Sequence, residues 1–485
     1  MSVKTLIRLI LLASLAVGVT GLIHPSLPVR ADTGATIQVN TTDDELNNDS
    51  DCSLREAIRA ANLNVAVDAC TAGSGSDTIL IPAGTYKLSR VGGDDSGVNG
   101  DLDISQSVTL EGVSNTTTII DANGNVTSDR AFDVQSGVNA TLTKMTIRGG
   151  KDNGFNGGGI RNQGTLILSK VLFIANSSSA SGGGLYNTST GKVTLNTVSF
   201  GNNQAYNGGA VYNAGELHAI ESALTFDQAI GGNGGGLFNN SGNVTLNKVT
   251  IAQETAGLNG GGIYNLGNLT ITYSTIQDNM ATSGDGGGIY GGWITVTHST
   301  IYQNQSPSGN GGGIYHLYYM SLSNVTLSAN SALKNGGGIY AKSDYPSTVT
   351  NTSLLGNTAA SGSGVFRDDS QVAALQLRNT LLLNAAGNCG GMITSLGHNI
   401  DSGTTCGFNQ SGDQNSTDPL TEALADNGGP TQTHALQSGS PAINGGDNTG
   451  CPATDQRGFL RLGGCDIGAY EYLKWVYMPF VRKSP

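Results

Sequence analysis

A short motif, GGGIYN or a close variant, recurs through the middle of this 485-residue chain. Its aliphatic position returns every 25 or 26 residues, at Ile160, Leu185, Val211, Leu237, Ile263, Ile289, Ile314, Ile339 and Val365. A second apolar marker keeps nearly the same period, at Ile147, Phe173, Phe200, Phe226, Ile251, Ile276, Ile301, Leu327 and Leu354. Such a period is typical of solenoids, in which each repeat buries its apolar face only by packing on its neighbours.

Within one repeat, apolar and polar residues alternate over short runs such as Val193-Thr194-Leu195, and Gly, Asn or Ser separates the runs. This period of two is typical of short β-strands joined by tight turns. We therefore predict an all-β chain that forms a single-stranded parallel β-helix, a pectate-lyase-like solenoid of about 25–26 residues per turn. Right-handed winding is expected, because parallel crossover connections are nearly always right-handed.

Asparagines follow the second marker by three residues in most repeats, at Asn176, Asn203, Asn279, Asn304, Asn330 and Asn357. Stacked amides pair with the turn above and the turn below, so this spacing predicts a structural asparagine ladder. By the same count, Ala229 and Glu254 take the place of the asparagine in two repeats.

Composition excludes several classes of protein. The chain has 72 glycines, only 12% charged residues and a formal net charge of −12. Few charges argue against a coiled coil, and the acidic balance argues against a surface that neutralises nucleic-acid phosphates. We therefore expect no nucleic-acid partner.

The N-terminus predicts export. Lys4 and Arg8 precede an apolar run from Leu9 to Ile23, and Val29-Arg30-Ala31 has the small residues of a signal-peptidase site. We interpret residues 1–31 as a signal peptide, and no later segment is apolar for long enough to span a bilayer.

Cysteine usage agrees with an oxidising compartment. The six cysteines form three local pairs, which we predict to be disulfides rather than zinc sites, because their spacing does not resemble metal knuckles. The pairs are Cys52 with Cys70, Cys389 with Cys406, and Cys451 with Cys465.

The repeats divide the chain into parts. Residues 32–76 are expected to form an N-terminal cap with a short helix, which Ser53-Leu54-Arg55-Glu56 opens with the spacing of a capping box. Residues 77–383 are assigned to the β-helix, residues 384–472 to a C-terminal cap and residues 473–485 to a tail.

Three segments resemble known families. Cys52 to Ile58 resembles the CSLREA motif of bacterial exported repeat proteins, and Gly100 to Ile104 is similar to a segment that often accompanies it. The GGGIYN units with F-x-x-N resemble the polymorphic outer-membrane protein repeat. Residues 418–471 resemble the choice-of-anchor Q domain. These resemblances imply a bacterial cell-surface or secreted β-helix, in families where adhesion or display is usual and a defined reaction is rare.

An aromatic residue follows the aliphatic position in most repeats, at Tyr186, Tyr212, Phe238, Tyr264, Tyr290, Tyr315, Tyr340 and Phe366. If the aliphatic side chain points inward, its neighbour points outward, so these rings should form a ladder along one side. Trp293, Tyr318 and Tyr319 lie near its middle. The ladder is a candidate ligand-binding face; the alternative is that the rings stack only on one another.

Acidic candidates are few. Asp94, Asp95, Asp101 and Asp103 lie in a Gly-rich loop and offer oxygen ligands for calcium, and a solvated loop is the alternative. The segment Arg367-Asp368-Asp369 places an acid pair beside a base. Because acids do not recur at the repeat spacing, the sequence predicts no catalytic residues.

Two functions remain, with a purely structural spacer as a third possibility. The first is a non-enzymatic, exported β-helix that binds a polysaccharide or another surface or matrix component through the aromatic ladder. The second is a polysaccharide lyase or glycoside hydrolase that acts on acidic polysaccharide, which needs several carboxylates and a base in one groove. Calcium is the one cofactor considered; otherwise none is expected.

Overall fold

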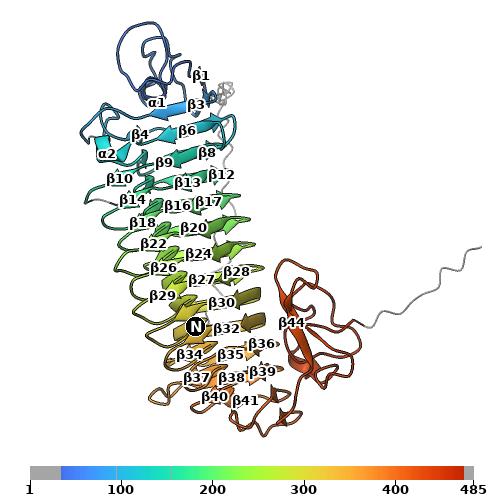
Figure 1. Ribbon diagram of the computed structural model, residues 1–485. Coiled ribbons are helices and arrows are strands. Elements are labelled where there is room, and N and C mark those ends of the chain that lie inside the picture. Colours follow the sequence, from blue (N-terminus) through green and yellow to red (C-terminus); the bar gives the residue numbers. More distant parts are fainter. Residues whose placement is uncertain (1–33, 94, 155, 474–485) are drawn as a thin grey trace, which may run out of the picture.

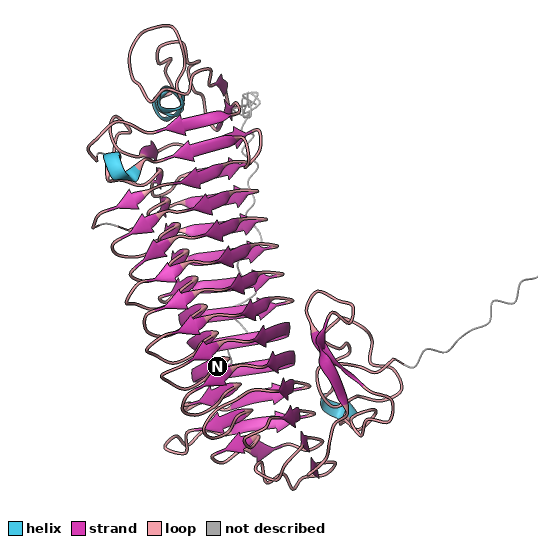
Figure 2. Cartoon of the chain, viewed as in Figure 1, coloured by secondary structure: helices cyan, strands magenta, loops and turns pink. Residues whose placement is uncertain are grey.

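The chain forms a long parallel β-helix (Figures 1 and 2), in a computed structural model that describes residues 34–93, 95–154 and 156–473. Successive turns pair in parallel along most of the described chain. The predicted repeats and parallel solenoid are therefore confirmed. The expected signal peptide and most of the tail lie outside the described residues.

Each turn contributes strands to columns that run along the helix. The first column contains β4 (Leu102–Ile104), β7 (Phe132–Val134), β11 (Ile160–Asn162), β15 (Leu185–Asn187), β19 (Val211–Asn213), β23 (Leu237–Asn239), β27 (Ile263–Thr272), β30 (Ile289–Tyr302), β32 (Ile314–Ser328), β34 (Ile339–Ala341), β37 (Val365–Arg367) and β40 (Cys389–Gly390). The second column contains β1 (Thr36–Gln38), β2 (Asp77–Ile81), β5 (Val108–Gly112), β8 (Asn139–Thr143), β12 (Thr165–Ser169), β16 (Lys192–Asn196), β20 (Glu216–Ile220), β24 (Asn243–Asn247), β35 (Ser347–Thr350), β38 (Leu375–Arg378) and β41 (Thr394–Ser395). Strands β27, β30 and β32 continue from the first column into the second, and β30 and β32 continue further into the third.

The third column contains β3 (Gly84–Lys87), β6 (Thr118–Asp121), β9 (Thr146–Arg148), β13 (Leu172–Ile174), β17 (Ser199–Gly201), β21 (Ala223–Thr225), β25 (Thr250–Ala252), β28 (Thr275–Gln277), β36 (Ser353–Leu355), β39 (Leu381–Leu383), β42 (Ile400–Asp401) and β43 (Gln414–Asn415). A separate sheet contains β10 (Lys151–Asp152), β14 (Ser177–Ser178), β18 (Gln204–Ala205), β22 (Gln228–Ala229), β26 (Thr255–Ala256), β29 (Met280–Ala281), β31 (Gln305–Ser306) and β33 (Ser331–Ala332).

The aliphatic residues of the repeat form an inward column. Ile263 pairs in register with Leu237 before it and with Ile289 after it, and these side chains are almost fully buried. Because the side chains of a strand alternate between its two faces, an aliphatic residue that points inward leaves the next residue in the sequence pointing outward. The register predicted from the GGGIYN motif is therefore confirmed.

The register of one turn differs from the prediction. Leu224, and not Phe226, pairs with Phe200 and Ile251. Leu224 is buried, whereas Phe226 is 50% exposed and has a left-handed backbone with φ of +63°. The prediction was wrong there because Phe226 follows a threonine, as the marker requires, whereas Leu224 follows an alanine. The residue in the asparagine column of that turn is therefore Asp227 and not Ala229.

The asparagine ladder is confirmed. The Nδ2 of Asn279 donates to the Oδ1 of Asn304 at 2.9 Å, and Asn304 donates in the same way to Asn330 at 2.9 Å. A second ladder, which the sequence analysis did not single out, joins the final asparagines of the GGGIYN motifs. It runs through Asn162, Asn187, Asn213, Asn239 and Asn265.

The glycine triplets make close turns between stacked backbones. Gly260 has φ of +66°, which side chains rarely tolerate. At Gly261, an added Cβ would lie 2.3 Å from the carbonyl oxygen of Gly287 in the next turn. Glycine is thus required there by the approach of one turn to the next.

A helix covers the first turns. Helix α1 (Leu54–Leu63) begins at Ser53 with the predicted capping box, in which Glu56 closes the reciprocal hydrogen bond. The guanidinium of Arg55 is buried and donates to the carbonyl oxygens of Gly97 and Asp101. A second, very short helix, α2 (Gly124–Thr127), lies beside the same turns.

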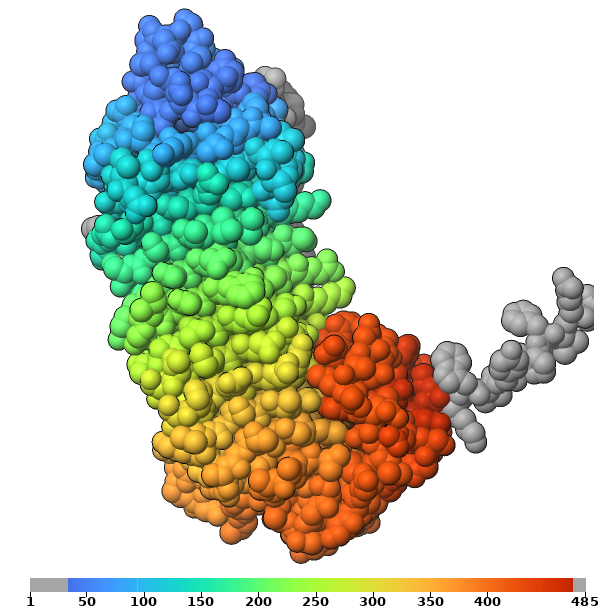
Figure 3. Space-filling view, viewed as in Figure 1, coloured from blue at the N-terminus to red at the C-terminus, as the bar shows by residue number. Residues whose placement is uncertain are grey.

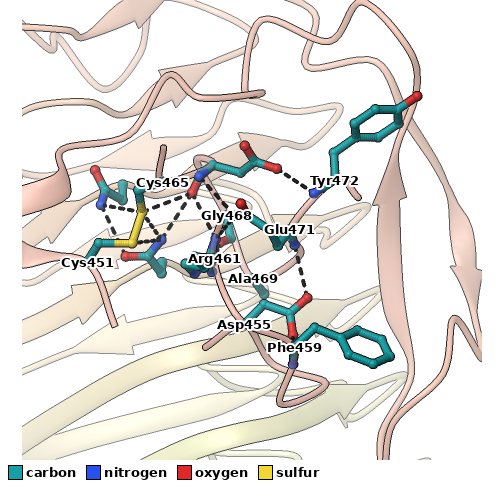
Figure 4. Close-up of polar contacts among 12 residues, drawn as sticks. Cys451, Asp455, Phe459, Arg461, Cys465, Gly468, Ala469, Glu471 and Tyr472 are labelled. Carbon is teal, nitrogen blue, oxygen red and sulfur yellow. Dashed lines mark hydrogen bonds and ion pairs between the residues drawn. A yellow bond between two sulfur atoms is a disulfide. The ribbon is translucent and has the colours of Figure 1, made fainter. Parts of the chain in front are cut away.

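Residues 418–473, the C-terminal unit, fold back along the side of the last turns (Figure 3). The unit contains the hairpin β44 (Thr421–Ala425) and β45 (Thr433–Leu436) and the 3-10 helix η2 (Asn448–Gly450). Gln456 bonds to the hydroxyls of Thr300 and Thr326 on β30 and β32. Figure 4 shows the unit's own polar core, where Arg461 pairs with Glu471 at 3.0 Å.

The three predicted cysteine pairs are disulfides in the structure. Cys52 bonds to Cys70 beside α1, and Cys389 bonds to Cys406 at the last turns. Cys451 bonds to Cys465 within the C-terminal unit (Figure 4). Each disulfide is therefore local, with one near the N-terminal end of the stack and two near its C-terminal end.

Two adjacent carboxyl groups interrupt the asparagine ladder. Asp227 accepts from Asn203, and the backbone N–H of Asp227 donates to Glu254 at 2.8 Å. Both side chains are buried. Burial raises the pKa of Asp227 to about 7, and burial followed by the charge of Asp227 raises the pKa of Glu254 well above its usual value.

We predict that Asp227→Asn stabilises the protein at high pH. The folded protein holds these protons more tightly than the unfolded chain. The contribution of this protonation to the free energy of unfolding is therefore fully present below pH 4 and is lost as the pH rises through about 7. Asparagine would restore the amide ladder without titrating. The free energy of unfolding, from urea titrations at several pH values, should rise by roughly 2 kcal/mol at pH 8 and change little at pH 4. An unchanged pH profile would contradict this expectation; Asp344→Asn, at an exposed loop position, is the control.

Candidate functional site

The aromatic residues form a continuous outward ladder on the first column. Adjacent rings lie nearly parallel, with centroids 4.8 Å apart for Tyr186 and Tyr212 and 5.0 Å apart for Tyr264 and Tyr290. The stack continues through Tyr315 and Tyr340 to Phe366. The predicted ladder is therefore present.

The ladder rings use their faces to stack on one another. Phe238, Tyr315 and Tyr340 are only 7–8% exposed. Burial raises the pKa of Tyr212 and of Tyr290 to about 12. The ladder therefore stabilises the column and presents ring edges, rather than the open ring faces on which a sugar would stack.

Open aromatic surface lies next to the ladder. Trp293, Tyr318 and Tyr345 are 41–47% exposed, and the ring of Trp293 lies 5.9 Å from that of Tyr319 and 5.3 Å from that of Tyr345. We name these four residues the aromatic cluster. Trp293, Tyr318 and Tyr319 were expected near the ladder from the sequence, whereas Tyr345 stands in a loop outside the repeat, where the period gives no signal.

The cluster lies where the second asparagine ladder ends. After Asn265, the next turn has Gly291 at the paired position, and β30 runs on with an irregular register between Gly291 and Trp293. At Gly292, an added Cβ would lie 2.6 Å from the ring of Tyr318. Loss of the asparagine turn and the absence of a side chain at Gly292 thus make room for the large rings.

Hydroxyl groups extend this surface. The residues after the cluster on the same strand faces are Thr295 and Thr297 on β30, with Ser321 and Ser323 in register on β32. Thr270 and Thr272 on β27 and Thr348 and Thr350 on β35 continue the two rows. The surface is polar and carries no charged side chain on these described positions.

A charged pocket lies at the N-terminal end of the ladder. In register, the outward row reads Asp103 on β4, Asp133 on β7, Arg161 on β11 and Tyr186 on β15. Two acids, Asp103 and Asp133, thus lie in register on adjacent turns although acids do not recur at the repeat spacing. These early turns are longer than 25–26 residues, so a search at the repeat period skips them.

The pocket has a volume of about 510 Å³, and its lining includes Asp95, Asp101, Asp129, Arg130 and Arg161. Arg130 bonds to Asp101 at 3.1 Å. Burial, followed by the carboxylates of Asp129 and Asp103, raises the pKa of Asp101 to about 8. The pocket thus brings several carboxyl groups together with the guanidinium groups of Arg130 and Arg161.

The remaining acidic candidates have different positions. Asp94 lies outside the described residues. Asp95 is exposed at the pocket, whereas Asp101 and Asp103 are buried. Arg367 bonds to Asp369 and to the carbonyl oxygens of Gln371 and Ala373, which holds its own loop together.

Comparisons with known proteins find few matches. The model of the Chlamydia polymorphic membrane protein repeat matches residues 324–342. Among solved structures, a crystal structure of pectate lyase Pel9A is similar, with 14% identity, a TM-score of 0.35 and coverage of 90% of this chain and 96% of that chain. No curated protein matches. The repeat resemblance is supported over that short segment, and the other two resemblances stay predictions.

Two general features bear on where the protein works. Three disulfides and the repeat match are typical of an extracytoplasmic protein. Among the described helices, none is long and apolar enough to cross a bilayer.

We predict that the ladder is mainly a source of stability. Tyr264→Ala removes stacking on both Phe238 and Tyr290. It should lower the free energy of unfolding by about 1–3 kcal/mol, measured by urea titration, whereas Tyr264→Phe keeps the ring and should cost much less. Equal losses for the two variants would contradict stacking as the cause; Tyr206→Ala, at a tyrosine 51% exposed just after β18, is the control.

Proposed function

We propose that this protein is a non-enzymatic, exported β-helix that binds a polysaccharide on the surface formed by the aromatic cluster and the hydroxyl rows. The observation that carries this proposal is the half-exposed ring of Trp293, with Tyr319 and Tyr345 beside it. Tryptophan and tyrosine offer an apolar body and a polar tip, which suits sugar rings that have both apolar faces and hydroxyl edges.

The charge of this surface favours a neutral glycan. The threonine and serine rows of β27, β30 and β32 donate and accept hydrogen bonds without carrying charge. The whole chain has a net charge of −12, which disfavours a long-range approach by an acidic polymer.

Export and surface location are part of the proposal. The segment 1–31 is the proposed signal peptide, and adhesion at a bacterial cell surface is the proposed role. The division into residues 32–76, 77–383, 384–472 and 473–485 and the right-handed winding are proposed with it, the winding because parallel connections favour that hand.

The binding test uses affinity electrophoresis of the purified protein in gels that contain neutral glucan, mannan or xylan, with polygalacturonate as the acidic comparison. Trp293→Ala combined with Tyr345→Ala should weaken binding to the retarding glycan at least tenfold, because each stacked ring contributes about 1 kcal/mol or more. Tyr206→Ala should bind normally. Unchanged retardation of the double variant would overturn the proposed surface.

The charged pocket supports a second candidate, a polysaccharide lyase or glycoside hydrolase. Several carboxylates and two arginines converge there, the arrangement that such chemistry needs. In that case Asp101 would serve as the acid and Asp129 as the base. Polygalacturonate incubated with the protein should then yield unsaturated products or new reducing ends, and Asp101→Asn should abolish them. No product at any pH between 5 and 9 would remove this candidate.

A further inference from the structure

We propose that Asp95, Asp103 and Asp133 bind a divalent cation, with the oxygen preference of Ca²⁺, at the N-terminal end of the aromatic row. This site differs from the one expected from sequence, because Asp133 joins it and Asp101 is turned toward Arg130. The proposal is independent of glycan binding and of catalysis.

The three carboxylates come from separate parts of the fold. Asp103 and Asp133 are paired on β4 and β7, and Asp95 lies on the loop between β3 and β4. One oxygen from each lies within 4.8 Å of the others. The backbone N–H of Gly97 donates to Asp103 at 2.8 Å, which holds the loop over the two strands.

The buried carboxylate of Asp133 supplies the second observation. Asp133 is 1% exposed, and its Oδ2 pairs with Arg161. Its Oδ1 is buried without a hydrogen-bond partner among the described residues. A buried carboxylate oxygen without a donor is costly, and a cation beside it would remove that cost.

Charge balance points the same way. Asp95, Asp103, Asp129, Asp133 and Asp152 surround this region, whereas the described basic groups that pair with them are Arg130 and Arg161. Like charges at such short range repel strongly when they are removed from water. A divalent cation would offset much of the excess and tie the loop segment that carries Asp95 to two successive turns.

The ligand types favour calcium. All three side chains offer oxygen, with neither sulfur nor imidazole in the group. Ca²⁺ accepts six to eight oxygens in flexible geometry, so exposed Asp95 leaves space for water ligands.

Two other acidic groups lie near α1, formed by Glu45, Asp49 and Asp51 and by Asp51, Glu56 and Asp68. They share Asp51, which is partly exposed. A test of the proposed site must therefore separate it from these groups.

The experiment is isothermal titration calorimetry of CaCl₂ into chelator-treated full-length protein, with thermal unfolding by circular dichroism in Ca²⁺ and in chelator. We expect saturable binding with a dissociation constant of about 10⁻⁵–10⁻³ M and a higher midpoint of unfolding in Ca²⁺. Asp95→Asn should weaken this binding at least tenfold, and the variant should fold because the Asp95 side chain is 87% exposed. Asp133→Asn should remove it.

The matched controls are Asp344→Asn, at an exposed loop position, and Asp51→Asn, in both acidic groups near α1. Both should keep the site. Absence of binding in the unaltered protein, or loss of binding in Asp51→Asn with normal binding in Asp95→Asn, would overturn the proposal.

Discussion

The in-register parallel pairing of one turn with the next is the constraint on which the rest of the molecule depends. Because the strands stack, each side chain meets its counterpart from the neighbouring turn at strand spacing. Like residues therefore gather into columns: aliphatic residues such as Ile263 inside, amides such as Asn304 in the turns, and rings such as Tyr264 outside. Each column satisfies its own packing or hydrogen bonding only if the adjacent turns match.

Departures from the columns create the distinctive surfaces. Where Gly291 replaces the asparagine, the strand continues and Trp293 emerges into solvent. At the N-terminal end of the aromatic row, Asp133 and Arg161 replace the rings, and a charged pocket forms. An uncharged polar surface on the second column and a charged pocket on the first thus both form where a column departs from its repeat.

Much of the fold could be predicted because its information is periodic and local. The aliphatic column, the asparagine ladder, the capping box at Ser53 and the cysteine pairs all follow from short spacings. The pocket could not be found in this way, since Asp103, Asp133 and Arg161 are 30 and 28 residues apart. At Phe226 the period misled the prediction instead: a hydrophobic residue near the expected position was taken for the buried one, which is Leu224.

By itself, the sequence determined that the chain forms the stacked turns of a β-helix. It also determined which residues point inward and which point outward, and that aromatic rings recur on one outer row. A fixed period carries that information, because strand alternation converts spacing into direction. Only the tertiary structure decided that the ladder rings cover one another's faces, that Tyr345 joins Trp293, and that carboxylates from turns of unequal length meet at Asp133. These facts depend on the register between turns, which is set by backbone pairing and not by any spacing within one segment.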